Sequence, residues 1–326
     1  MSRTFDQFVR FTTDAAGLER ILRLLQSITQ ILTSYPFLLE SLLILLAAFT
    51  TTTNPTTTHD APNVAQTSLI LLSLRAKLNL ARRYFRIFRF LESFSAAQKL
   101  YTSLHTSQSK PHSQSKSQSP ARRPSPRAAV WLDVLGRTFN GMYLLLEAST
   151  IVDAQRVDGL APWGPEAEAA LAVEGQRFWL FSLVCGVLAG LVRVVDIWGS
   201  VPASAPASAP ASGDRDGNGQ GSEVEIADAD KLPENTDHTG AAAAGDGGSK
   251  EQQIDYAVWR REARARISGL GRRVVSDALD ITLPGSVVGW VPAGAGTVGL
   301  AMFVTTLLTS VDIWERCGRE LDAGQK

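Results

Sequence analysis

The sequence has few of the residues that build reactive or cross-linked sites. It contains 2 cysteines and 4 histidines in 326 residues. Cys185 lies in an apolar run and Cys317 stands alone, with no CxxC motif or Cys/His cluster, which argues against a disulfide framework and a zinc site. Phosphate loops and the GxSxG, HExxH and Rossmann glycine patterns are also missing. We therefore expect a protein that is not an enzyme, with no catalytic, cofactor-binding or metal-binding residues.

The net charge of the chain is also zero, but its charged residues are unevenly distributed along the sequence. The chain has 32 basic and 32 acidic side chains. Residues 1–128 carry 16 Lys/Arg against 6 Asp/Glu, whereas residues 199–253 carry 10 acids against 3 bases. A basic front of this kind suits an anionic surface, such as a membrane with anionic phospholipids.

Two compositionally biased stretches divide the chain. Residues 102–129 are rich in Ser, Gln, Lys, Pro and Arg, and residues 199–253 in Ala, Pro, Gly and acids. Neither stretch can bury enough apolar surface to offset the entropy of ordering, so we expect two disordered inserts. They separate helical regions at residues 1–101, 130–198 and 254–326. Because no useful strand-period alternation occurs, the sequence predicts an all-α, membrane-associated helical bundle.

One or two segments are marginal candidates for membrane-spanning helices. Residues 178–192 are fifteen uncharged residues, close to the minimum length for a span. Residues 281–311 are also uncharged, but prolines and glycines interrupt them, which leaves residues 294–314 as the better helix. For the shorter run, a buried core helix of a soluble bundle stays open as an alternative.

The two candidate spans end with the same four residues, Val-Asp-Ile-Trp. This repeat places a carboxylate and an indole together where acyl chains give way to headgroups. The expected interfacial anchors are Asp196, Trp198, Asp312 and Trp314. Two GxxxG spacings, Gly186 with Gly190 and Gly285 with Gly289, suggest close helix packing, although glycine-rich apolar runs also produce this spacing by chance.

Residues 75–100 form the sharpest pattern, a basic amphipathic helix. With a turn of about 100° per residue, the arginines share one sector and apolar residues cover the rest. The residues expected to bind the membrane are Arg75, Leu78, Arg82, Arg83, Phe85, Arg86, Phe88, Arg89 and Leu91. The arginines would meet anionic headgroups while the aromatic face enters the acyl boundary. A helix of a soluble bundle is the main alternative, and nucleic-acid binding is disfavoured because no nucleic-acid module is present.

In order along the chain, three segments resemble the peroxin-eleven family of peroxisomal membrane proteins. Residues 8–32 look like its N-terminal helix, and residues 82–94, RRYFRIFRFLESF, resemble its basic helix. Residues 274–314, with VSDALDITLPG and a final DIW, are similar to its membrane-anchoring end. The long inserts suggest a divergent fungal member of the third type. The resemblance implies peroxisome elongation, proliferation and fission with a dynamin-related GTPase and its membrane adaptor.

The leading hypothesis is membrane remodelling by insertion of the basic helix and self-association into a homo-oligomer. One alternative is a pore or metabolite channel of the organelle membrane, although few polar residues lie within the apolar runs. Another is an adaptor whose inserts bind division factors. Ser119 and Ser125, each followed by proline, are candidate phosphorylation sites, where added phosphate would weaken attraction to lipid.

Overall fold

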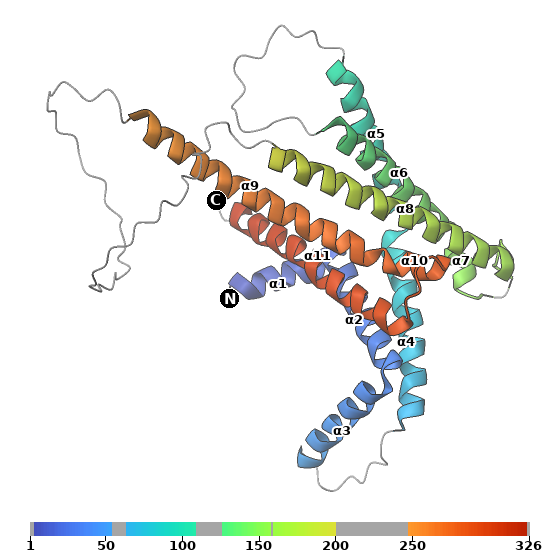
Figure 1. Ribbon diagram of the computed structural model, residues 1–326. Helices are drawn as coiled ribbons and strands as arrows, with labels where there is room; N and C mark the ends of the chain where they lie inside the picture. Colours follow the sequence, from blue (N-terminus) through green and yellow to red (C-terminus); the bar gives the residue numbers. More distant parts are fainter. Residues whose placement is uncertain (1–2, 54–62, 109–125, 158, 200–246, 325–326) are drawn as a thin grey trace, which may run out of the picture. The chain divides into compact units, whose positions relative to one another are not determined.

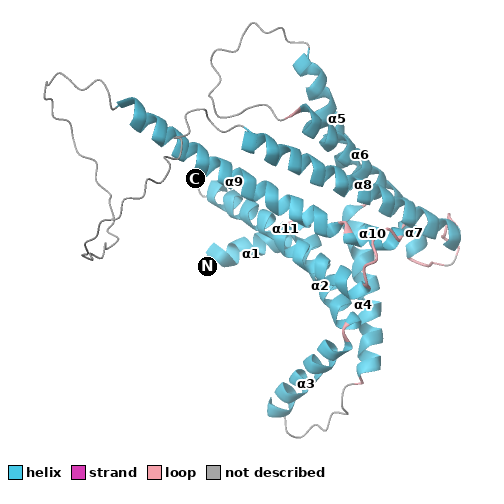
Figure 2. Ribbon diagram, in the orientation of Figure 1, coloured by secondary structure: helices cyan, strands magenta, loops and turns pink. Residues whose placement is uncertain are grey.

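The computed structural model describes residues 3–53, 63–108, 126–157, 159–199 and 247–324. The regular structure in these ranges is entirely α-helical, which confirms the expected fold class (Figure 2). The chain divides into a larger unit, Met1–Asp196 with Ser268–Lys326, and a smaller unit, Ile197–Ile267. All packing described below lies within the larger unit.

The helices of the chain pack mainly as antiparallel or crossing pairs. In chain order they are α1 (Arg3–Thr13), α2 (Ala15–Ser34), α3 (Pro36–Thr53), α4 (Val64–Arg86), α5 (Arg89–Gln108), α6 (Arg127–Ser149), α7 (Ile151–Ala154), α8 (Gly164–Gly199), α9 (Gly247–Asp280), α10 (Thr282–Val288) and α11 (Ala295–Gly324). Helix α2 packs against both α4 and α11, and α5 packs along α6 (Figure 1). Helix α2 therefore sits at the centre of the packing that positions the site.

The ends of both expected inserts are helical. Helix α5 continues to Gln108 because no glycine or proline interrupts it, and α6 begins at Arg127, directly after Pro126. Helix α9 begins at Gly247, within the second insert. The remaining residues of the inserts, together with Ser119 and Ser125, lie outside the described ranges.

The basic segment is two helices and not the single helix expected over residues 75–100. Helix α4 ends at Arg86 and α5 begins at Arg89. In the turn between them, the N–H of Ile87 donates to the carbonyl of Tyr84 at 3.3 Å and that of Leu91 to Phe88 at 3.1 Å. These tighter i to i−3 bonds redirect the chain without glycine or proline, so the residue pattern carried no sign of the break.

The larger unit buries polar and charged side chains beside its apolar core, and it leaves many large apolar side chains on its exterior. Its buried side chains include Glu19, Arg23, Arg82, Asp280 and Thr305. Many large apolar side chains are uncovered, among them Phe37 at 76%, Phe88 at 71% and Val195 at 70% exposure. A soluble bundle buries its large apolar side chains, whereas extensive exposed apolar surface marks a membrane or protein contact. The distribution therefore suits a surrounding of lipid.

Two helices are long and apolar enough to cross a membrane, in agreement with the sequence. They are α8, Gly164–Gly199, and Ala295–Ala323 of α11. Only 22% and 33% of their most apolar windows are buried, so most of each faces outward. A third candidate is the pair Ala15–Ser34 and Pro36–Phe49, which is bent by 104° and has the length and composition of a broken span or a re-entrant loop. Sequence reasoning did not identify this candidate, because the apolar run in the second helix is too short to span a membrane by itself.

The two Val-Asp-Ile-Trp repeats have different surroundings. Asp196 and Trp198 are exposed, and the anchoring role of this pair stays a prediction. Asp312 pairs with Arg272 of α9 at 3.1 Å. The Trp314 ring packs edge-on against Phe11, with ring centroids 5.8 Å apart. This second repeat therefore also holds α11 against its neighbours.

The two GxxxG spacings also differ. A Cβ atom at Gly190 would lie 2.3 Å from Cγ2 of Val274, and one at Gly186 would lie 2.8 Å from Oδ2 of Asp277. Both glycines thus face α9 at close range. Gly285 instead approaches Val291 in the loop after its own helix, while Gly289 ends α10 with a φ of 83° and has no atom within 4 Å of a built Cβ. Gly285 and Gly289 therefore do not form the expected helix-packing pair.

We predict that Gly190→Ala destabilises the folded protein relative to Gly269→Ala. Both changes gain helix propensity, but only the first forces a methyl group into Val274, an overpacking cost of about 1–3 kcal/mol. Thermal unfolding of the full-length protein in detergent micelles would measure the difference. Equal stability of the two variants would contradict the close α8–α9 approach.

Candidate functional site

The arginines of the basic segment point mainly into the bundle. The side chains of Arg82, Arg86 and Arg83 retain 8%, 12% and 21% of their exposure, and only that of Arg89 is about half exposed. Arg75 and Leu78 are half-buried. The expected headgroup-facing arginine surface is therefore wrong for Arg82, Arg83 and Arg86, because buried carboxylates lie opposite them.

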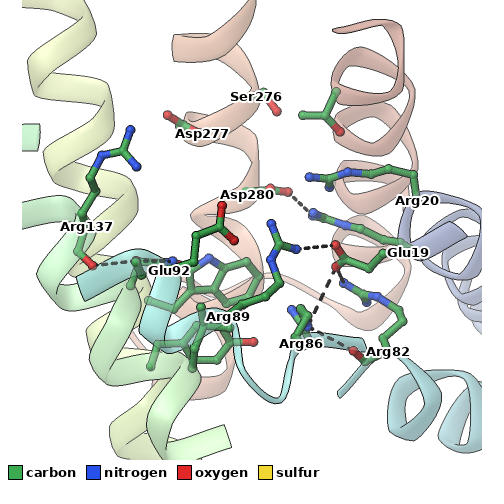
Figure 3. Close-up of a pocket in the computed structure, with 17 residues that line it drawn as sticks. Glu19, Arg20, Arg82, Arg86, Arg89, Glu92, Arg137, Ser276, Asp277 and Asp280 are labelled. Atoms are coloured by element: carbon green, nitrogen blue, oxygen red, sulfur yellow. Dashed lines mark hydrogen bonds and ion pairs between the residues drawn. The ribbon is translucent and has the colours of Figure 1, made fainter. Parts of the chain in front are cut away.

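Glu19 of α2 is the first of these carboxylates. Its Oε2 atom lies 2.9 Å from Nη1 of Arg89, and its Oε1 atom lies 3.5 Å from Nη2 of Arg82 and 3.9 Å from Nε of Arg86 (Figure 3). Three arginines from α4 and α5 thus converge on one carboxylate. Arg82 also donates from Nη1 to Oε1 of Gln26 at 2.7 Å, which adds a second link between α4 and α2.

Glu147 of α6 is the second carboxylate. Nη2 of Arg86 lies 2.8 Å from its Oε1 atom, and Nε of Arg83 lies 3.8 Å away. The hydroxyl of Tyr143 donates to the same oxygen at 3.1 Å. Burial raises the pKa of Tyr143 to about 12, which keeps it a neutral donor. Burial alone lowers the pKa of Arg86, but Tyr143, Glu147 and Glu19 outweigh it and raise that pKa.

Asp280 at the end of α9 extends the cluster to α11. Nη2 of Arg23 lies 2.5 Å from its Oδ1 atom, and the hydroxyl of Thr305 donates to that oxygen at 2.6 Å. Arg23 also donates to the Thr305 hydroxyl at 3.2 Å. Buried ionic groups of α2, α4, α6 and α9 are therefore joined through side chains far apart in the sequence.

The apolar side of the basic segment faces outward. Phe85, Phe88 and Leu91 are all exposed, as is Tyr84. These residues surround the turn between α4 and α5. The structure thus keeps the expected amphipathic separation but reverses its direction, since the charged side is inside and the aromatic side is uncovered.

The charged residues surround a cavity of about 300 Å³ between α2, α4, α5, α6, α8, α9 and α11. Its charged lining consists of Glu19, Arg20, Arg23, Arg82, Arg86, Arg89, Glu92, Arg137, Asp277 and Asp280. A second cavity of about 400 Å³ shares Arg82, Arg86, Tyr143 and Trp179 with the first. Within the described ranges no group of three His, Cys, Asp or Glu side chains could hold a metal ion. Oxyanions are the ligands that arginine-lined cavities suit best.

Sequence reasoning did not find Glu19, Glu147, Tyr143 or Asp280. The one available signal was that Glu147 is an isolated carboxylate within an apolar helical run, residues 142–151. An isolated acid in such a run is costly unless it has a partner, so it predicts a buried cation. It does not reveal which cation, because the partners lie on other helices.

Asp277 lies beside this cluster and borders α8. Its pKa is raised to about 6, mainly by burial; Arg273 at 3.9 Å opposes this shift and the nearby Asp280 adds to it. The ionised form of Asp277 is therefore disfavoured in the folded protein.

The comparison with protein families gives one match. Residues 56–314 match the family model described as Peroxisomal biogenesis factor 11 (PEX11). No curated protein and no solved structure gives a significant match. The matched region covers most of the chain and includes all of α4 to α10, with the first two-thirds of α11.

We predict that Glu19→Gln lowers the free energy of unfolding by about 3–5 kcal/mol, because it leaves buried arginines without their shared carboxylate. The matched control is Asp322→Asn, which breaks the exposed Arg3–Asp322 pair and should cost no more than about 1 kcal/mol. Chemical denaturation in detergent would compare them. Similar losses in both variants would argue against a stabilising role for the buried cluster.

A second prediction concerns pH. Since the folded pKa of Asp277 is about 6 and its ordinary value is 3.8, ionising this group opposes folding. The penalty is absent below about pH 4, grows towards pH 6 and is complete above it. Asp277→Asn should therefore stabilise the protein at pH 8, by up to about 3 kcal/mol, and have little effect at pH 4.

Thermal unfolding at the two pH values would measure this difference. Asp312→Asn, at an exposed ion pair, serves as the control and should change stability little at either pH. An equal effect of Asp277→Asn at both pH values would contradict the assignment.

Proposed function

Because the chain belongs to the Peroxisomal biogenesis factor 11 (PEX11) family, it is a peroxisomal membrane protein of peroxisome proliferation, and we propose that it elongates the membrane through its apolar exterior. The observation that carries the proposal is the uncovered apolar surface of α3 and the first half of α4. We name this surface the apolar arm, α3 together with residues 64–74 of α4.

Helix α3 is apolar on nearly all sides. Of its large apolar residues only Leu39 is buried, while Phe37, Leu42, Ile44, Leu45 and Leu46 are exposed. On α4, the exposed residues Leu69, Ile70, Leu72 and Leu74 continue the surface. A helix that is apolar all round needs a partner inside a protein or in lipid. For a peroxisomal membrane protein, acyl chains are the simplest partner.

The turn between α4 and α5 supplies a second apolar contact. Phe85, Phe88 and Leu91 are exposed there and can enter the acyl boundary of the membrane. This contact retains the proposed insertion of the aromatic residues into the membrane. The proposed contact of the arginines with headgroups is replaced, since the paired arginines stabilise the bundle and are not displayed to headgroups.

Shallow insertion from one side expands one leaflet relative to the other and favours positive curvature. In this proposal α8 and α11 anchor the protein while the apolar arm and the Phe88 turn act as wedges. Self-association into a homo-oligomer would concentrate the wedges along a tubule. A dynamin-related GTPase, recruited with its membrane adaptor, would then divide the elongated organelle, and anionic phospholipid would strengthen attachment.

A second candidate function is a pore or metabolite channel. The adjoining polar cavities favour it, because they place arginines and other polar side chains inside a bundle with an apolar exterior. Planar-bilayer recording with the purified protein would then show discrete conductance. The adaptor hypothesis depends on inserts that lie mostly outside the described residues, so the structure adds nothing to it.

We predict that Ile44→Asp with Leu46→Asp reduces peroxisome elongation in cells that express the full-length protein. A carboxylate among acyl chains costs up to about 3 kcal/mol, the value at the bilayer centre, so two of them should prevent insertion of the apolar arm even at shallow depth. Targeting should persist because α8 and α11 are unchanged. Fluorescence microscopy of peroxisome length would measure the effect.

The matched control is Gln98→Asp with Thr102→Asp on α5. These two positions are exposed and polar, so the change adds the same charge without altering an apolar surface. Full elongation by the Ile44→Asp, Leu46→Asp variant, at equal peroxisomal abundance, would overturn the wedge role of the apolar arm.

A further inference from the structure

We propose that the cavity at the centre of the larger unit binds a phosphate monoester, either a free small molecule or the headgroup of a phospholipid. The proposal goes beyond membrane elongation, since it assigns a ligand to the interior of the bundle. It rests on the charge balance of the cavity, on two arginines of the lining that form no ion pair among the described residues, and on the size and polarity of the lining.

The cavity lining carries more positive than negative charge. Six arginines and four carboxylates line it, an excess of two positive charges. Arg89, Arg82 and Arg86 are held by Glu19, and Arg23 is held by Asp280. The excess of two therefore lies on the Glu19 group, where three arginines share one carboxylate and Arg86 is also held by Glu147 outside the lining.

Arg20 and Arg137 differ from these paired arginines, although Glu19 and Asp280 attract Arg20 from a greater distance. Among the described residues neither guanidinium has a hydrogen bond or an ion pair, and the Nε atom of Arg20 is buried without a partner. Figure 3 shows Arg137 on one side of the cavity and Arg20 with Arg89 on the other. Arg20 is half-buried and Arg137 is exposed, so an anion between these side chains would stabilise the site chiefly through the guanidinium of Arg20.

The two other carboxylates of the lining are already counted in the excess of two. Asp277 lies 3.9 Å from Arg273, which is outside the cavity lining. Glu92 is exposed and has no ion pair among the described residues. Glu92 is thus the one carboxylate that would compete with an incoming anion, and its removal should favour binding.

The chemistry of the lining selects a phosphate monoester over other anions. A monoester carries about −1.5 to −2 charges near neutral pH, which matches the excess of two. Guanidinium groups bind its oxygens in bidentate geometry. The volume of about 300 Å³ leaves room for a few carbon atoms beside the phosphate, and Ser93, Asn140 and Tyr143 offer further polar contacts. A long acyl chain would not suit this polar lining.

The test uses the full-length protein in nanodiscs of phosphatidylcholine. Glycerol 3-phosphate is the free probe, measured by isothermal titration calorimetry, with glycerol as the uncharged control. Phosphatidate added to the nanodiscs is the lipid probe, measured by the shift in thermal unfolding. Binding of the free probe identifies a soluble ester as sufficient, and binding of phosphatidate alone identifies a lipid headgroup. Binding of neither probe would overturn the proposal.

Variants locate the binding. Arg20→Gln with Arg137→Gln should weaken binding by about tenfold or more, because it removes the two unpaired guanidinium groups. Arg3→Gln with Arg272→Gln removes the same charge outside the cavity and should leave the affinity unchanged. Equal weakening by both double variants would show nonspecific attraction and would overturn the site.

Glu92→Gln provides a test that does not depend on the buried arginines. Its side chain is exposed, so the substitution should leave folding intact, and removal of the competing carboxylate should tighten binding several-fold. A purely structural arginine cluster would show no such gain. Unchanged affinity in Glu92→Gln would contradict the placement of the ligand in this cavity.

Discussion

The convergence of arginines on Glu19 is the interaction on which the rest of the structure depends. One carboxylate of α2 meets Arg82 and Arg86 of α4 and Arg89 of α5, and it is almost fully buried. Buried charges are tolerated only when they are paired, so α2, α4 and α5 must stay together. Arg86 continues the cluster to Glu147 of α6, which ties a fourth helix to the same centre. Because α4 and α5 are separate helices, Arg86 and Arg89 approach the same carboxylate from two different helices.

Charged side chains occupy part of the interior, and many large apolar side chains lie on the outside. This explains why most of the α8 and α11 windows face outward, and why α3 has almost no protein cover. In water such a surface would drive association, whereas in a bilayer it is the expected exterior. The same arrangement joins the two functional ideas, since the exterior serves contact with acyl chains and the interior offers a polar, positively charged cavity.

Sequence reasoning was accurate where a property is local and periodic. The absence of strand alternation indicated the all-α fold, and uncharged runs indicated the two spans. It was less accurate for residues 75–100, where it identified an amphipathic segment but assigned the wrong surroundings to Arg82, Arg83 and Arg86. Helical periodicity defines two faces, but it does not say which face meets protein and which meets lipid. Nor did it indicate the turn at residues 87–88, which contains neither glycine nor proline.

The sequence by itself determined the helical composition, the apolar spans, the family and the positions of the arginines. Only the tertiary structure decided what those arginines contact. Arg23 and Asp280 are 257 residues apart, Glu19 and Arg89 are 70 apart, and Arg86 and Glu147 are 61 apart. Local patterns cannot show such pairings, because each carboxylate lies on a different helix and meets its cation only when the bundle packs. The physical reason is the cost of an unpaired buried charge, which makes the partner of each arginine a property of the whole fold.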